Sequence, residues 1–150
     1  MRFNRRLAPF FLVVSFLMLM LSGCSTLNDV VAAKDSGKEG TTKVYSVNQD
    51  QAWEIAKKVF RCEGSDAIEE HRREGYMLTS SGLNMVSWGA VMGAWIEPVN
   101  KNTTKVTVVT KRRVTMNVAT TLTEGTFQRC FAKEVANLEP GKSISSKCPE

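Results

Sequence analysis

The sequence has one histidine among 150 residues and lacks the short motifs of the common catalytic sites. It contains no His-Glu-x-x-His, no Cys-x-x-Cys and no Gly-x-Ser-x-Gly. Zinc hydrolases, thiol–disulfide oxidoreductases and serine hydrolases with a nucleophile elbow need these residues at these spacings. The histidine, His71, lies in the charged stretch EEHRRE, where we expect it to be solvated on a turn. We therefore expect no catalysis, no cofactor and no metal site.

Acidic residues are missing from the first 23 positions, where three arginines precede an apolar run, Leu7–Leu21. Small residues, Ser22 and Gly23, then come directly before Cys24. A basic start, a short apolar run and small residues before a cut are typical of a secretory signal peptide. The run is too short for a permanent anchor, because its helix reaches only about 22 Å against a hydrocarbon core of roughly 30 Å.

The sequence Leu-Ser-Gly-Cys at 21–24 resembles the lipobox of bacterial lipoproteins. In that family the cysteine thiol receives a diacylglycerol, the signal peptide is cut before the cysteine, and the new amino terminus is acylated. The resemblance implies that residues 1–23 are removed and that Cys24 is lipidated. Several acyl chains together would anchor the protein stably in a membrane. In Gram-negative members an aspartate after the cysteine implies retention in the inner membrane. Ser25 stands there instead, which implies the periplasmic face of the outer membrane.

Charge is nearly balanced once the signal peptide is set aside. The whole chain has 20 basic and 15 acidic residues, and the signal removes three arginines and no acid. A nearly neutral domain gives no reason to expect nucleic acid as a partner. After Cys24, residues 25–42 are rich in Ser, Gly, Thr and charge, so we expect a flexible tether over 24–42. Such a tether spans about 20–25 Å as a random coil, although 27–34 could form a helical turn or two.

One small domain is expected over residues 43–138, with a polar tail over 139–150. Asn48 with Gln51 predicts a capping box at the start of a helix over 49–62. A second helix is expected from Thr123 to the Glu-Pro-Gly sequence at 139–141. Alternating or β-rich patterns predict five strands, at 43–47, 67–70, 76–80, 91–97 and 105–118. The last is too long for this domain, so we expect it to bend or break at 111–113 and to resume at 114–118.

The order β-α-β-β-β-β-α predicts an α+β fold, a two-layer sandwich with both helices on one face of an antiparallel sheet. This order resembles domains of outer-membrane lipoproteins that sit on envelope assembly machines. Their first helix starts with a similar Asp-x-Ala-Trp, here Asp50–Trp53. The chain is also similar, through SSGLNMVSWG, EPV and TKVTVVTKRRV, to small bacterial lipoproteins of uncharacterised function. The resemblance implies the fold and the location, and it transfers no activity.

The most apolar stretch after the signal peptide contains Met85, Trp88, Met92 and Trp95. Such residues are more often core than binding surface, yet Met and Trp are also enriched at interfaces. Two glycines, at 89 and 93, would allow close backbone approach. We expect these side chains to form a docking surface for an envelope protein. A pocket for a small apolar ligand under the same segment is the alternative.

Three consecutive basic residues, Lys111, Arg112 and Arg113, follow a predicted strand. One interpretation is a solvated strand end. The other is contact with anionic phospholipid headgroups or with an acidic partner.

Three cysteines remain if Cys24 is lipidated, in a compartment that favours disulfides. Cys62 and Cys130 lie on same-handed flanks of the apolar stripes of the two expected helices. This geometry predicts a Cys62–Cys130 disulfide and leaves Cys148 free or available to another chain, while the other two pairings stay possible.

The sequence thus favours a non-enzymatic interaction module of the bacterial envelope, held in the membrane by a diacylglycerol and an acyl chain. A binder or carrier of a small apolar ligand, such as a lipid, is the alternative. No pattern indicates an oligomeric state.

Overall fold

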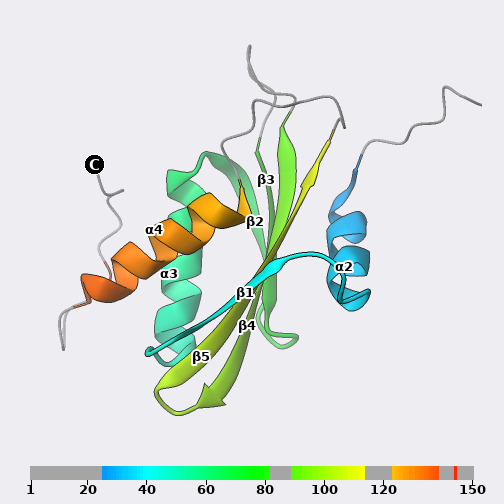
Figure 1. Ribbon diagram of the computed structural model, residues 1–150. Coiled ribbons are helices and arrows are strands. Elements are labelled where there is room, and N and C mark those ends of the chain that lie inside the picture. The colour runs from blue at the N-terminus through cyan, green and yellow to red at the C-terminus, as the bar shows by residue number, and fades with distance from the viewer. Residues whose placement is uncertain (1–24, 82–88, 114–122, 139–143, 145–150) are drawn as a thin grey trace, which may run out of the picture.

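The structure is a computed structural model that describes residues 25–81, 89–113, 123–138 and 144. Its elements, labelled as in Figure 1, are α2 (Leu27–Asp35), β1 (Thr41–Tyr45), α3 (Gln49–Cys62), β2 (Ser65–His71), β3 (Tyr76–Ser81), β4 (Ala90–Asn100), β5 (Thr103–Arg112) and α4 (Glu124–Ala136). The predicted strand at 114–118 lies outside the described residues, as does most of the predicted polar tail.

The five strands form one antiparallel sheet in the order β1-β5-β4-β3-β2. Helices α3 and α4 lie on one face of this sheet, and the shorter α2 lies on the other (Figure 1). The predicted α+β fold, with two helices on one face of an antiparallel sheet, is confirmed. Helix α2 adds a third layer that the sequence patterns did not predict.

Side-chain caps begin both long helices. The Asn48 side chain accepts a hydrogen bond from the Gln51 backbone N–H at 2.8 Å, and the Gln51 side chain accepts one from the Asn48 N–H at 3.1 Å. This reciprocal pair satisfies two backbone donors that the first turn of a helix leaves without partners. Thr123 caps α4 by accepting from the Thr126 N–H at 3.2 Å.

The main core lies between the sheet and the helices α3 and α4. Alternate positions of β4 and β5 point into it and meet four large aromatic side chains from the helices: Trp53, Phe60, Phe127 and Phe131, each at most 1% exposed. Full burial of one large apolar side chain stabilises a fold by roughly 1.5–3 kcal/mol. These contacts place α3 and α4 side by side on the sheet.

A second apolar cluster lies between α2 and the opposite face of the sheet. Val30 and Ala33 of α2 are buried against Leu78, Val91, Trp95 and Val109 of the strands. The prediction of a flexible tether over 24–42 is therefore wrong for α2 and for β1. The physical reason is that the central strands are apolar on both faces, so the second face needs a cover, although α2 itself buries only two residues.

Candidate interaction sites

Two of the four apolar residues predicted to form a docking surface, Met92 and Trp95, lie in the described part of the chain, and neither is exposed. Met92 is fully buried in the main core, and Trp95 is only 7% exposed in the second cluster. Successive odd and even positions of a strand point to opposite faces, so β4 sends one of these side chains to each core. The docking role predicted for Met92 and Trp95 is therefore wrong. Met85 and Trp88 lie outside the described residues.

Gly93 serves the packing of Trp95. A Cβ atom built at Gly93 would lie 2.7 Å from two atoms of the Trp95 ring and 3.0 Å from a methyl group of Leu78. Real Cβ atoms do not approach other atoms so closely, so the missing side chain lets the indole lie against the sheet. Gly93 thus allows the Trp95 ring of the same chain to approach the backbone closely. The sequence had suggested that a partner protein makes this approach.

A groove of about 600 Å³ lies between α2 and the β2–β3 hairpin. It is lined by Thr26, Leu27, Asn28, Val31, Ala32 and Asp35 from the helix side and by Glu69, His71, Tyr76 and Leu78 from the sheet. The lining includes two carboxylates, Asp35 and Glu69, and no lysine or arginine. The sequence patterns did not predict this groove, because one wall is α2.

Stacked rings form one side of the groove. The His71 and Tyr76 rings lie 4.5 Å apart at 16°, and Tyr76 stacks on Trp95 at 5.8 Å. His71 Nε2 is 2.8 Å from Glu69 Oε1, and the Lys34 ammonium lies 5.7 Å from the Trp95 ring centroid. His71 is the last residue of strand β2, and a ring contact and a hydrogen bond hold its side chain. The sequence had predicted that it is solvated on a turn. Stacked rings of this kind add about 0.5–1.5 kcal/mol beyond their buried area.

The three basic residues lie at the end of β5. Lys111 forms an ion pair with Glu39, Arg112 is exposed, and the Arg113 backbone N–H donates to the Gly89 carbonyl at 3.3 Å. The first turn of α2 lies at this same end of the sheet (Figure 1). There the pKa of Asp29 is lowered, first by hydrogen bonds from Thr26 and in smaller part by the charge of Lys111.

The predicted Cys62–Cys130 disulfide is wrong. Cys130 is a free thiol whose Sγ donates to Glu63 Oε1 at 3.2 Å. Burial, and then this hydrogen bond, raise the pKa of Cys130. Cys62 is itself disulfide-bonded, and its partner is not the free Cys130. Positions on same-handed flanks of the two helices were not enough to bring the cysteines together. Helix α4 places Cys130 against Glu63, the residue that caps α3, and not against Cys62.

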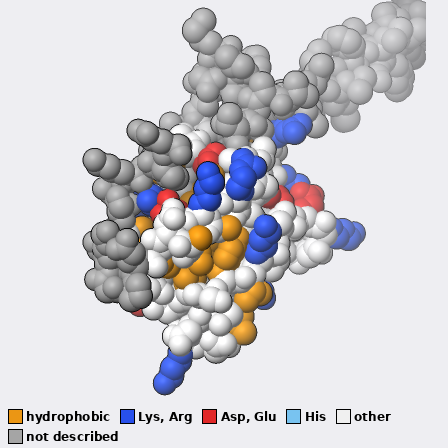
Figure 2. Space-filling view, turned by 60° about the vertical axis from the view of Figure 1, so that its left-hand side comes forward, with side chains coloured by type: hydrophobic (Ala, Val, Ile, Leu, Met, Phe, Trp, Pro, Cys, Tyr) orange, Lys and Arg blue, Asp and Glu red, His pale blue; other side chains and the backbone are white. Residues whose placement is uncertain are grey.

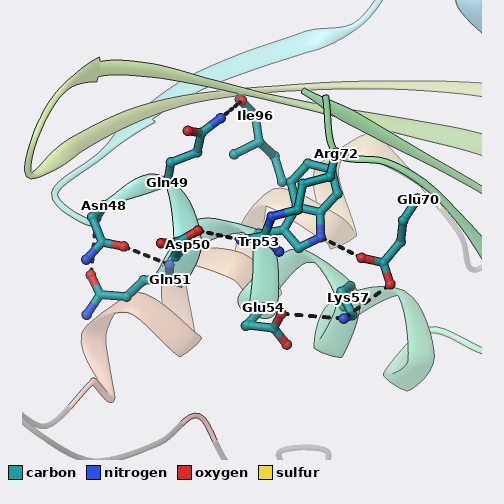
Figure 3. Close-up of polar contacts among 10 residues, drawn as sticks. All are labelled: Asn48, Gln49, Asp50, Gln51, Trp53, Glu54, Lys57, Glu70, Arg72 and Ile96. Atoms are coloured by element: carbon teal, nitrogen blue, oxygen red, sulfur yellow. Dashed lines mark hydrogen bonds and ion pairs between the residues drawn. The ribbon is translucent and has the colours of Figure 1, made fainter. Parts of the chain in front are cut away.

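The charged stretch at the end of β2 and the Asp50–Trp53 sequence form one structural cluster (Figure 3). The buried Trp53 indole N–H donates to Glu70 Oε2 at 2.7 Å, and the Arg72 guanidinium lies 5.2 Å from the Trp53 ring centroid. Arg72 also pairs with Asp50. The pKa of Glu70 is lowered, first by the hydrogen bond from Trp53 and then by Lys57. The cluster joins α3 to β2, so its charges have structural partners.

The part of the chain that the structure describes holds neither a cluster of metal ligands nor a helix that could span a membrane. There, no three His, Cys, Asp or Glu side chains come together as ligands for a metal ion. No helix in that part of the chain combines the length and the apolar character needed to cross a membrane. Comparison of the chain with protein-family models, with curated proteins and with solved structures finds no significant match.

Proposed function

We propose that the chain is a lipid-anchored interaction module of the bacterial cell envelope, attached to the periplasmic face of the outer membrane and without catalytic activity. The observation that carries this proposal is the lipobox-like sequence at 21–24 placed directly before a folded domain. Only Ser25 and Thr26 separate Cys24 from the first residue of α2. An acylated cysteine at this position would hold the whole domain at the membrane.

The end of the sheet near the turn that joins β4 to β5 is the surface that suits a protein partner. Val44 and Val99 are the exposed large hydrophobic residues of the described part of the chain, at 58% and 59% exposure. Val44 of β1 lies opposite Lys105 of β5, and Lys105 lies opposite Glu97 of β4 in the register of the sheet. Val99 comes two residues after Glu97 on β4, so the two valines lie at the same end of the sheet. The first strand, β1, is also an edge of the sheet. An edge strand beside exposed apolar side chains can accept an extended segment of another protein.

One face of the domain carries apolar side chains that gather in a patch, with lysine and arginine side chains near it (Figure 2). Apolar side chains inside a polar border are the usual anatomy of a protein interface. Exposed patches of this kind on small domains commonly mark interaction sites.

The lipid anchor is tested by the mass of the mature protein. Cys24→Ala should accumulate as uncleaved precursor without the mass of the acyl chains, whereas the wild-type chain should carry that mass and stay with membranes. A mature wild-type protein that is soluble in the periplasm, with an unmodified thiol at Cys24, would contradict the proposal.

The protein partner is tested by crosslinking in cells. A photoreactive amino acid at 44 and at 99 should capture the same envelope protein, and Val44→Asp should abolish the crosslink formed from 99. The same probe at Lys133, which is exposed on α4, is the matched control and should not capture that protein. Different captured proteins at 44 and 99, or equal capture from 133, would argue against this surface.

A second candidate function, the binding of a small apolar ligand such as a lipid, is favoured by the groove beside α2. Leu27, Val31 and Leu78 supply apolar walls, and the stacked His71 and Tyr76 rings supply one side. Organic extracts of the purified protein should then contain a lipid that is missing from extracts of Val31→Glu. Extracts that contain no ligand in either case would exclude this candidate.

A further inference from the structure

We infer that the end of the sheet where α2 begins and β5 finishes faces the bilayer, and that Arg112 and Arg113 at this end bind the anionic headgroups of phospholipids. The inference rests on the proposed lipidation of Cys24 and deepens it, because it states which surface of the domain meets the membrane. The sequence alone allowed every orientation, since it predicted a tether between the anchor and the domain.

The reach of the chain limits the orientation. Two residues, Ser25 and Thr26, connect Cys24 to α2, and two residues span at most about 7 Å. A free chain over 24–42 would instead span about 20–25 Å. Cys24 therefore stays close to the first turn of α2, and so does the bilayer surface that receives its acyl chains.

The direction of α2 on the sheet is fixed at both of its ends. At the start, the Asp29 carboxylate accepts hydrogen bonds from Thr26 and senses the charge of Lys111 at the end of β5. In the middle, Val30 is fully buried against the sheet. In the last turn, Lys34 pairs with Glu97 at 3.9 Å, toward the turn that joins β4 to β5. The start of α2 and the end of β5 consequently share one end of the sheet (Figure 1).

The carboxylates near this end are already occupied. Glu39 pairs with Lys111, and Glu124 accepts hydrogen bonds from the Thr41 hydroxyl at 2.6 Å and from the Thr110 N–H at 3.1 Å. Asp29 is engaged by Thr26. Among the described residues no carboxylate pairs with Arg112 or Arg113.

Both guanidinium groups thus lack a carboxylate partner among the described residues. Arg112 is exposed and open to an external anion. Arg113 is half-buried, and its Nε is shielded from solvent without a hydrogen-bond partner among the described residues, so contact with a headgroup would fall to its terminal nitrogens. A guanidinium presents a planar set of donors that matches two oxygens of a phosphate. The nearest anions to this end would be the headgroups around the anchor, because Cys24 holds it at the membrane surface. Basic residues next to a membrane are attracted to anionic lipids over about one Debye length.

Orientation can be measured by energy transfer from two positions on the acylated full-length protein. In a Cys130→Ser background, a donor dye is attached through Asn28→Cys in one sample and through Lys101→Cys in another, since both positions are exposed. The protein is reconstituted into vesicles of phosphatidylcholine with or without phosphatidylglycerol, and acceptor dyes are attached to the headgroups. Position 101 lies beyond the far end of β4, whose 11 residues span about 35 Å.

In vesicles with phosphatidylglycerol, transfer from position 28 should exceed transfer from position 101 several-fold. Arg112→Glu with Arg113→Glu should reduce this ratio at least two-fold at low salt and much less at high salt. The matched control is Lys43→Glu with Lys133→Glu, which makes the same change of charge at two exposed residues on other surfaces. That variant should keep the wild-type ratio, and thermal melts should show that all variants fold.

The outcomes separate this inference from the proposed function. A chain that carries acyl mass and floats with the vesicles, but gives equal transfer from 28 and 101, would overturn the inference alone. An unchanged ratio in the double arginine variant would overturn the role of the arginines. A chain without acyl mass that does not float would overturn the proposed function and this inference together.

Discussion

Lys58 of α3 and Glu134 of α4 form an ion pair of 2.7 Å in a place that water hardly reaches, with side chains only 9% and 8% exposed. The pair joins the two helices that cover the main core. A buried charge that loses its partner keeps the cost of leaving water without the compensating attraction. The contact therefore specifies how α3 and α4 sit against each other.

Removing one partner of this pair should destabilise the domain strongly. We expect Glu134→Leu to lower the free energy of unfolding by about 3–5 kcal/mol, and Lys58→Met combined with Glu134→Leu to recover most of that loss. Urea unfolding of the three proteins measures this. The control is Glu54→Gln, which breaks an exposed pair with Lys57 and should cost at most about 1 kcal/mol. Additive losses in the double variant would show that the pair is not coupled.

Adding one methyl group to Gly93 should also destabilise the domain, because its Cβ would overlap the Trp95 ring. We expect Gly93→Ala to cost about 1–3 kcal/mol, since the indole is packed under α2 and has little room to move. Gly125→Ala is the matched control, because no atom lies within 4 Å of its added Cβ and alanine favours helix α4. Thermal melting should therefore rank the control at or above the wild type. Equal melting of both variants would contradict the packing described for Trp95.

Stability should fall at high pH through Tyr45. Burial raises the pKa of Tyr45 from 10.0 to about 12, and its hydroxyl donates to Gln128 Oε1 at 2.6 Å. The folded state thus keeps a proton that the unfolded chain loses, so unfolding becomes easier as the pH rises from about 10 to 12. Tyr45→Phe should be less stable at pH 7, by about 1 kcal/mol for the lost hydrogen bond. Denaturant unfolding should show that this difference shrinks above pH 10, and a constant difference would contradict the raised pKa.

Disulfide mapping should separate the two cysteines of the long helices. Cys130 is free and Cys62 is disulfide-bonded, so alkylation of the unfolded, unreduced protein should label Cys130 and leave Cys62 unlabelled. If Cys24 is acylated, the peptide bonded to Cys62 should contain Cys148, which is the remaining cysteine in the sequence. A Cys62–Cys24 peptide would instead contradict the lipid anchor. Cys62→Ser should cost about 2–4 kcal/mol.

Local signals in the sequence predicted most of the fold, because they depend on neighbouring residues. The Asn48–Gln51 capping box and the apolar stripes of α3 and α4 specify helices before any tertiary contact forms. In the stretch that forms β4, Gly89, Gly93 and Pro98 argue against a helix, and the Val- and Thr-rich composition of β5 favours a strand. For α2 the sequence allowed only a helical turn or two at 27–34 within a flexible tether, because the helix buries only Val30 and Ala33 and its composition is that of a linker.

The candidate sites were harder to predict, because they depend on which face of the sheet receives a cover. Met92 and Trp95 look like a binding surface when one face of β4 is assumed to be open. With α2 in place, both faces of β4 are covered, and the exposed large hydrophobic side chains among the described residues are Val44 and Val99. The groove with His71 and Tyr76 joins segments that are far apart in the sequence.

The attachment of α2 to the sheet also determines how the domain responds to mechanical load. If Cys24 is fixed in a membrane, tension on the domain acts first on α2, which is held mainly by Val30 and Ala33. Detachment of α2 would release residues 25–40 as an extensible segment on the order of 50 Å long, while the strands stay paired. It would also uncover Trp95. We expect single-molecule pulling from position 25 to show a short extension at low force before the sheet unfolds, and a single cooperative rupture would contradict this order.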